Sequence, residues 1–190
     1  MRVGLKVKTA IMVFVVLLSL SAAMPPLISG DRGNHTQETH VNYYIEVSLS
    51  RCKLSLYEKR ERNSLVLIKE YKVGTAVKGI PSFPLGKGKV TRIELNPWWH
   101  PTEYTREIYR QRGIELPKAV PPGDPLNYMG AFKIHLSHKT ARGSIYRIHG
   151  TNNPKRIGRR VTGGCICMDN AEGLDLAKTI SLGTEVNIVL

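Results

Sequence analysis

The sequence has few cysteines, few acidic residues and no long hydrophobic run. Three cysteines in 190 residues are an odd number, and a chain of this length can bury a core without disulfide bonds. Only 15 acidic residues oppose 28 lysines and arginines, so the chain is basic. Repeats and low-complexity tracts are lacking, and the lack of alternating strand–helix units argues against a doubly wound sheet. These absences favour one ordinary globular domain.

The first 23 residues have the composition of a secretory signal peptide. They begin with Arg2, Lys6 and Lys8, continue through an apolar run from Ala10 to Leu20, and end in small residues suited to a signal peptidase. The run is shorter than the roughly 20 apolar residues of a spanning helix, which disfavours an uncleaved membrane anchor. Cleavage is predicted near residue 23, so we expect export to the periplasm or cell envelope, with no stable membrane span afterwards.

Residues 24–41 are polar and turn-rich and are predicted to form a flexible linker, which leaves residues 42–190 as one domain. A cleaved leader removes three basic residues, so that 25 basic residues oppose 15 acidic ones. Such a charge attracts anionic envelope polymers or membrane head groups, although basic residues that merely solvate the surface explain it equally well. Export argues against nucleic acid as a partner.

Alternating apolar and polar residues predict a mainly β fold with one or two short helices. Helices are expected at 102–113, which has helical spacing and ends at a glycine, and at 169–180, which opens with a capping pattern from Asp169 to Glu172. Strands are expected at 41–50, 52–59, 64–76, 84–95, 131–137, 144–150, 161–168 and 184–190.

The stretch from Ile148 to Asn170 concentrates the reactive groups. It contains His149 after a strand-like run and Cys165 directly after two glycines. Glycines at this position leave main-chain N–H groups free to stabilise an oxyanion. The stretch therefore predicts a cysteine nucleophile with a histidine base, whereas a lone cysteine is more often a buried structural thiol.

These residues resemble the L,D-transpeptidase (YkuD) family. The resemblance lies in the HGTNNP opening at 149–154 and the TGGCICM close at 162–168, where the family usually has SHGCIRM. Upstream segments at 75–90, 96–102 and 116–130 are also similar, so the likeness extends from Tyr43 to Leu190. Two positions depart from the pattern: Gly163 stands where the family usually has histidine, and Cys167 where it usually has arginine.

The resemblance implies a β-sandwich-like catalytic fold and a thioester mechanism on peptidoglycan stem tetrapeptides. Cys165 would be the nucleophile and His149 the base, with the Gly150 carbonyl orienting the imidazole. Main-chain N–H groups around Gly163, Gly164 and Cys165 would form the oxyanion hole, and neither a metal nor an organic cofactor is implied. Stem peptides would be partners, and attachment of a wall-anchored lipoprotein is one outcome.

Three functions stay open from sequence. The first is a transpeptidase, and the second is an L,D-carboxypeptidase or wall-link hydrolase on the same scaffold, in which water replaces the acceptor amine. The third is a non-catalytic wall-binding module, for which the departures at Gly163 and Cys167 are the only argument. The resemblance implies reaction with carbapenems, as is typical of the family, so a covalent carbapenem adduct on Cys165 would eliminate this third function.

Several other side chains have two interpretations. Tyr128, Arg159 and Arg160 are candidates for substrate contact, although packing for the tyrosine and solvation for the arginines are the simpler expectations; Lys155 and Arg156 are left undecided. His100 is expected to pack with Trp98 and Trp99, and His135 and His138 lie three apart on a strand, which places them on opposite faces and argues against a metal site. Cys52 and Cys167 form either a disulfide or two free thiols, with free thiols favoured.

Overall fold

The computed structural model describes residues 41–79, 83–140 and 145–190, so the predicted signal peptide and nearly all of the predicted linker lie outside the described residues. The mainly β prediction is confirmed. The strands are β1 (Asn42–Ser48), β2 (Lys53–Lys59), β3 (Leu65–Ala76), β4 (Gly86–Leu95), β5 (Phe132–Lys139), β6 (Ile145–His149), β7 (Arg160–Thr162), β8 (Ile166–Met168) and β9 (Glu185–Val189). The helices are α1 (Glu103–Arg110) and α2 (Asn170–Thr179), with short 3₁₀ turns η1 (Glu61–Asn63) and η2 (Pro154–Arg156).

The strands form one sheet that closes on itself. Its order is β2-β1-β9-β4-β5-β6-β8-β3-β7, and a further pairing joins β2 to β3. Closure depends on the length of β3, whose Leu65–Lys72 part pairs with β2 while Val73 and Gly74 pair with β8. The result is a barrel-like sandwich whose interior is filled by alternate side chains of the strands.

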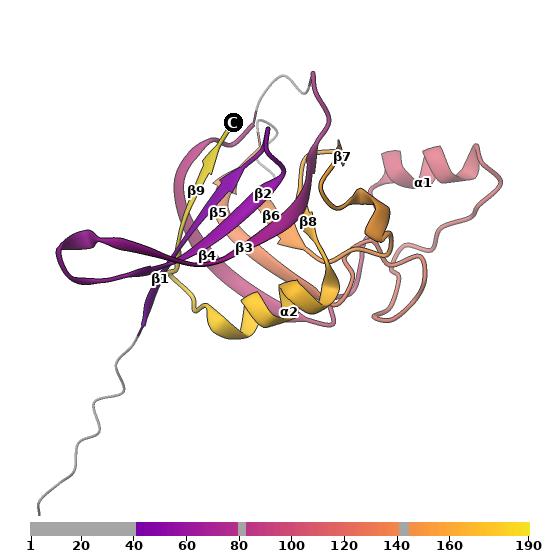
Figure 1. Cartoon of the computed structure of the whole chain (residues 1–190). Coiled ribbons are helices and arrows are strands. Elements are labelled where there is room, and N and C mark those ends of the chain that lie inside the picture. Colours follow the sequence, from indigo (N-terminus) through magenta and orange to yellow (C-terminus); the bar gives the residue numbers. More distant parts are fainter. Residues whose placement is uncertain (1–40, 80–82, 141–144) are drawn as a thin grey trace, which may run out of the picture. The chain divides into compact units, whose positions relative to one another are not determined.

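The hydrophobic core lies between the strands and α2, which Figure 1 shows along one side of the sheet. Ile134, Ile148 and Ile166 come from three neighbouring strands and are fully buried, and Leu176 of α2 packs with them. The predicted cap is present, because the Asp169 carboxylate accepts hydrogen bonds from the N–H groups of Ala171 (2.9 Å) and Glu172 (3.2 Å). Such a cap fixes the point at which α2 begins, directly after β8.

A long connection between β4 and β5, residues 96–131, has a small core of its own. Trp99 and Val120 form an antiparallel bridge with main-chain hydrogen bonds of 3.0 and 2.8 Å. Leu116 completes a buried cluster with them, and Tyr109 and Tyr128 pack at its edge. The connection is therefore an ordered element rather than a loose loop.

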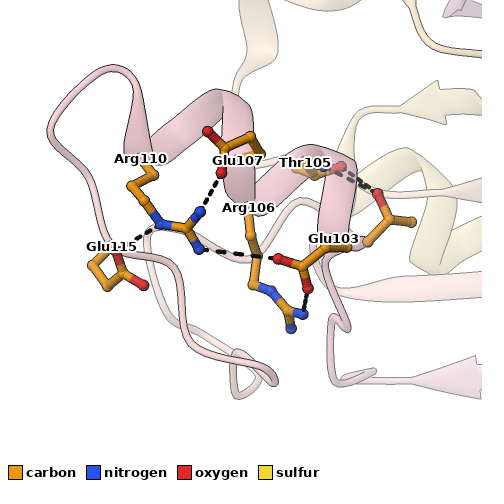
Figure 2. Close-up of polar contacts among 7 residues, drawn as sticks. Glu103, Thr105, Arg106, Glu107, Arg110 and Glu115 are labelled. Atoms are coloured by element: carbon orange, nitrogen blue, oxygen red, sulfur yellow. Dashed lines mark hydrogen bonds and ion pairs between the residues drawn. The ribbon is translucent and has the colours of Figure 1, made fainter.

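The helix in this connection, α1, carries a group of ion pairs on its exposed surface. Figure 2 shows the Arg110 guanidinium among the carboxylates of Glu103, Glu107 and Glu115. No residue of α1 is buried. Its ion pairs are therefore exposed to solvent, and exposed ion pairs add little stability. Tyr109 connects α1 to the rest of the domain, because its hydroxyl donates a hydrogen bond to the Tyr128 hydroxyl at 2.6 Å.

One predicted strand is wrong as a continuous element. The run at 161–168 splits into β7 and β8 around the glycine pair, because Gly164 has φ of 147°, which is outside the range that a strand uses. The described helices include none that is long and apolar enough to cross a membrane.

Candidate active site

The polar groups of the candidate site lie on the outer face of β5, β6 and β8. The register pairs Lys133 with His149, and His149 with Cys167. Side chains of paired residues share a face, and the intervening Ile148 and Ile166 are in the core. Alternation therefore places His149 and Cys167 on the side of the sheet opposite the core.

His149 is fixed by its own turn. Its Nδ1 lies 2.7 Å from the Gly150 carbonyl oxygen; because a carbonyl only accepts, Nδ1 carries the proton and Nε2 is left as the free acceptor. The residue is 6% exposed. Burial lowers the pKa of the imidazole to about 4, against the raising effect of the Gly150 hydrogen bond, and nearby Arg156, Arg147 and Lys133 lower it further. His149 is therefore neutral at pH 7, as a general base must be.

Asn170, at the start of α2, holds the peptide unit to which His149 is bound. Its Oδ1 accepts from the Thr151 N–H at 3.0 Å and from the Ala131 N–H at 3.1 Å, and its Nδ2 donates to the Thr151 carbonyl at 2.9 Å. The Thr151 N–H and the Gly150 carbonyl belong to the same peptide unit. The sequence does not predict this role of Asn170, because the helical pattern identifies the residue only as the start of a helix.

Two glycines make room for this carboxamide. A Cβ on Gly150 would lie 2.1 Å from Asn170 Oδ1, and a Cβ on Gly130 would lie 2.2 Å from the same atom. Gly130 also has φ of 64°, which disfavours other residues. The glycine after the histidine is thus required for space as well as for the hydrogen bond that it accepts.

The glycine pair before Cys165 is held by hydrogen bonds from both sides. The Tyr146 hydroxyl donates to the Gly164 carbonyl at 2.5 Å, and the Thr162 hydroxyl donates to the Cys165 carbonyl at 2.6 Å. The Gly164 N–H donates to Thr162 Oγ1 at 3.3 Å, so it is engaged. Gly163 and Cys165 remain as candidate oxyanion donors.

Cys165 is partly exposed as a residue, while its sulfur lies deep enough that burial raises the pKa of the thiol. Arg147 opposes this rise, first of all through its positive charge, which lowers the pKa of the thiol. Sequence reasoning missed Arg147. Only the strand register shows that a residue two places before His149 lies opposite Cys165.

The candidate nucleophile Cys165 directly precedes β8, the strand that pairs with the strand of the candidate base His149. Because His149 pairs with Cys167, Cys165 lies diagonally across the β6–β8 pair from the imidazole. Within residues 41–79, 83–140 and 145–190, no hydrogen bond joins the Cys165 thiol to His149. A hydrogen bond between nucleophile and base need not form before substrate binds, so its absence is compatible with a base role for His149.

The other predicted contact residues have defined positions. Tyr128 packs against Trp99 with ring centroids 4.9 Å apart, as the packing interpretation expected. Arg156, left undecided from sequence, stacks over the Tyr128 ring at 4.1 Å and donates to its hydroxyl at 2.6 Å. Arg159 is exposed, whereas Arg160 is half-buried and its Nε donates to the Ala76 carbonyl at 3.1 Å.

All three cysteines are free thiols. Cys52 Sγ lies 3.4 Å from Thr75 Oγ1, and the Cys167 sulfur lies against Gly74, where an added Cβ would be 2.5 Å from it. Cys52 and Cys167 therefore lie against two neighbouring residues of β3, Thr75 and Gly74, and no disulfide joins the two cysteines.

Three other histidines lie within the described residues. His135 Nε2 is 2.7 Å from Glu94 Oε1, and His138 Nε2 is 2.8 Å from the Gly86 carbonyl oxygen. His100 is exposed, as is Trp98, whereas Trp99 is buried, so the predicted packing of His100 with the two tryptophans is wrong. In the described part of the chain, His, Cys, Asp and Glu side chains form no group of three able to hold a metal ion.

Comparison with known structures supports the fold. The structure of Bdellovibrio bacteriovorus Bd1075 aligns with a TM-score of 0.52 and 20% identity, over 78% of this chain and 48% of that one. L,D-transpeptidase 3 of Mycobacterium tuberculosis, in complex with a faropenem-derived adduct, aligns with a TM-score of 0.51 and 14% identity, over 79% and 61%. At these identities the likeness shows a shared fold.

Sequence comparison gives the family. Residues 42–188 match the L,D-transpeptidase catalytic domain, YkuD. The provisionally named L,D-transpeptidase YkuD of Bacillus licheniformis is 32% identical over 89% of this chain and 76% of its own length. The provisionally named YcfS of Escherichia coli strain K12 is 43% identical over 53% of this chain, which is 30% of its length, so the chain spans about a third of that relative. The chain belongs to the YkuD L,D-transpeptidase family.

Proposed function

We propose that this protein is an exported cysteine L,D-transpeptidase that acts on peptidoglycan stem tetrapeptides. The observation that carries the proposal is the geometry of His149. A buried, neutral imidazole is anchored through Nδ1 to the Gly150 carbonyl, on the strand β6 that pairs with β8, and β8 begins directly after Cys165. Export is supported by the leader pattern of residues 1–23, and membership of the family supports the reaction class.

In the first half-reaction the Cys165 sulfur bonds to the carbonyl carbon of the third stem residue, and the thiol proton passes to Nε2 of His149. The carbonyl oxygen takes up negative charge near the N–H groups of Gly163 and Cys165, which would stabilise it. The carbon–nitrogen bond then breaks, and His149 returns the proton to the departing D-alanine amine. The product is a thioester on Cys165.

In the second half-reaction an acceptor amine attacks the thioester carbon and gives its proton to His149. The carbon–sulfur bond breaks and the proton returns to the Cys165 sulfur, so the enzyme is restored. An amine of a second stem forms a cross-link, and a lysine of a protein would attach that protein to the wall. Water in place of the amine gives an L,D-carboxypeptidase, which is the alternative on the same scaffold.

Product analysis separates the functions. The full chain is incubated with a disaccharide tetrapeptide, and the products are identified by mass spectrometry. The proposal predicts a cross-linked dimer that has lost one D-alanine. A tripeptide without dimer would assign a carboxypeptidase, and unchanged substrate together with tight binding would assign a wall-binding module.

A further inference from the structure

Arg147 lies directly beside the candidate nucleophile. It precedes His149 by two residues on β6, and since His149 pairs with Cys167, alternation in the parallel register places Arg147 opposite Cys165. Its positive charge lowers the pKa of the Cys165 thiol, as expected of a cation close to the sulfur. A group bonded to that sulfur would therefore lie within reach of the guanidinium.

Arg147 is a half-buried cation without an acidic partner. Across the described ranges 41–79, 83–140 and 145–190, no Asp or Glu side chain forms an ion pair with it. Its neighbour on β5 is His135, which is bound to Glu94 at 2.7 Å. Glu94 is also bound to Lys133 at 2.9 Å and to Arg92 at 3.1 Å, so this carboxylate is already shared among three basic side chains.

A second arginine near the site is also without an acid. Arg156 is bound to Tyr128 through its stacking and its hydrogen bond, and no carboxylate pairs with it among the residues that the structure describes. The surroundings of His149 and Cys165 thus carry an excess of positive charge in a partly buried setting. Such charge is costly unless an anion offsets it, and a partly buried arginine favours a carboxylate as a bidentate partner.

We propose that Arg147 binds the C-terminal carboxylate of the donor peptide, which is the carboxylate of the D-amino acid that departs when Cys165 is acylated. The inference rests on the proposed function and names its specificity determinant. In an attacking complex the reacting carbon lies about 3–3.5 Å from the sulfur. The terminal carboxylate is three bonds further on, about 3–4 Å away, so it is the donor's nearest carboxylate to Arg147.

This subsite makes the enzyme select donors that end one residue after the scissile bond. A donor with an amidated C-terminus loses the charge, and a donor extended by one residue moves the carboxylate away. In both cases the Arg147 guanidinium is unpaired in the complex. The acylation rate falls as a result, because the carboxylate adjoins the reacting atoms.

The test uses two tetrapeptide donors that differ only in a free carboxylate or a carboxamide at the C-terminus. The acylation rate of Cys165 is measured by intact-protein mass spectrometry for the full chain, for Arg147→Met and for the matched control Arg92→Met, whose guanidinium is already paired with Glu94. The parent and the control are expected to prefer the free carboxylate by about tenfold or more. Arg147→Met is expected to lower that preference to about twofold or less.

The outcomes separate the subsite from the function. Acylation of the parent by both donors at equal rates would overturn the subsite while supporting the enzyme. Equal slowing of both donors in Arg147→Met would also overturn it, since that is the result of a role toward the thiolate alone. Acylation by neither donor in the parent would overturn both proposals. If Arg147→Met does not fold, Arg147→Lys, which keeps the charge but not the planar fork, must retain an intermediate preference.

Discussion

The Asn170 carboxamide and the His149 imidazole hydrogen-bond to opposite ends of one peptide unit, that between Gly150 and Thr151. Asn170 Oδ1 accepts from its N–H at 3.0 Å, and its carbonyl accepts from His149 Nδ1 at 2.7 Å. The start of α2 is thereby tied to the orientation of the candidate base, because rotation of this peptide would turn the imidazole away from Cys165.

Asn170→Ala should slow carbapenem acylation of Cys165 by about ten- to a hundredfold, since a small misplacement of a catalytic group has effects of this size. Alkylation of the same thiol by iodoacetamide needs no positioned base and should change by less than about threefold. Asn152→Ala is the matched control. Asn152 follows Thr151 directly, but its side chain donates to the Pro125 carbonyl, so this substitution should leave both rates unchanged. Equal losses in both reactions would mean that Asn170 serves folding alone.

The glycine pair should respond unequally to substitution. Gly163 is not among the glycines with positive φ, and a Cβ there would meet no atom within 4 Å, so Gly163→His should fold normally and raise the acylation rate by supplying the side chain that the family usually has. Gly164 has φ of 147°, so Gly164→Ala should destabilise the turn. Thermal unfolding and carbapenem kinetics measure both effects. A folded Gly163→His with slower acylation would contradict the first expectation.

Stability should fall as pH falls from about 6.5 to about 4, partly through His149. Burial lowers the pKa of this histidine in the folded protein from 6.5 to about 4, so in this window the unfolded chain binds more protons. The contribution of His149 to the free energy of unfolding is therefore fully present above pH 6.5 and is lost toward pH 4. The loss amounts to about 3 kcal/mol. Urea unfolding across this range should show a steeper loss for the parent than for His149→Gln. His100→Gln, at an exposed position, is the control, and parallel curves for parent and His149→Gln would refute the assignment.

Thiol counting tests the state of the cysteines. All three are free, so unfolded, unreduced protein should react with about three equivalents of a thiol reagent. Recovery of a single free thiol, with a peptide that links Cys52 to Cys167, would show that the pair oxidises despite its separate contacts with Thr75 and Gly74.

The sequence predicts the local features of this fold better than its closure. Alternation predicts most strands, and the capping pattern at Asp169 correctly predicts the start of α2, because both depend on neighbouring residues. Nothing local indicates that β3 pairs with β2 at one end and β8 at the other, since alternation assigns faces and not partners. The pattern at 161–168 predicts one continuous strand, because the amino-acid sequence does not show which φ a glycine adopts.

The same distinction applies to the site. Residue type and spacing predict His149 and Cys165 as candidates, whereas Asn170 and Arg147 come close to them through contacts that only the folded register creates. Asn170 is 19 residues beyond Thr151, to which it is hydrogen-bonded, and Arg147 becomes a neighbour of Cys165 only when β6 and β8 pair in parallel. Physical proximity across strands, and not local pattern, defines both.

The most direct test of the account is a mass measurement on Cys165. The full chain is incubated with a carbapenem and digested, and the adduct is located by peptide mass spectrometry in the parent, Cys165→Ala and His149→Ala. The account predicts one adduct, on Cys165, that is absent from Cys165→Ala and forms at least about a hundredfold more slowly in His149→Ala. An adduct on Cys52 or Cys167 instead, or one that persists in Cys165→Ala, would contradict it.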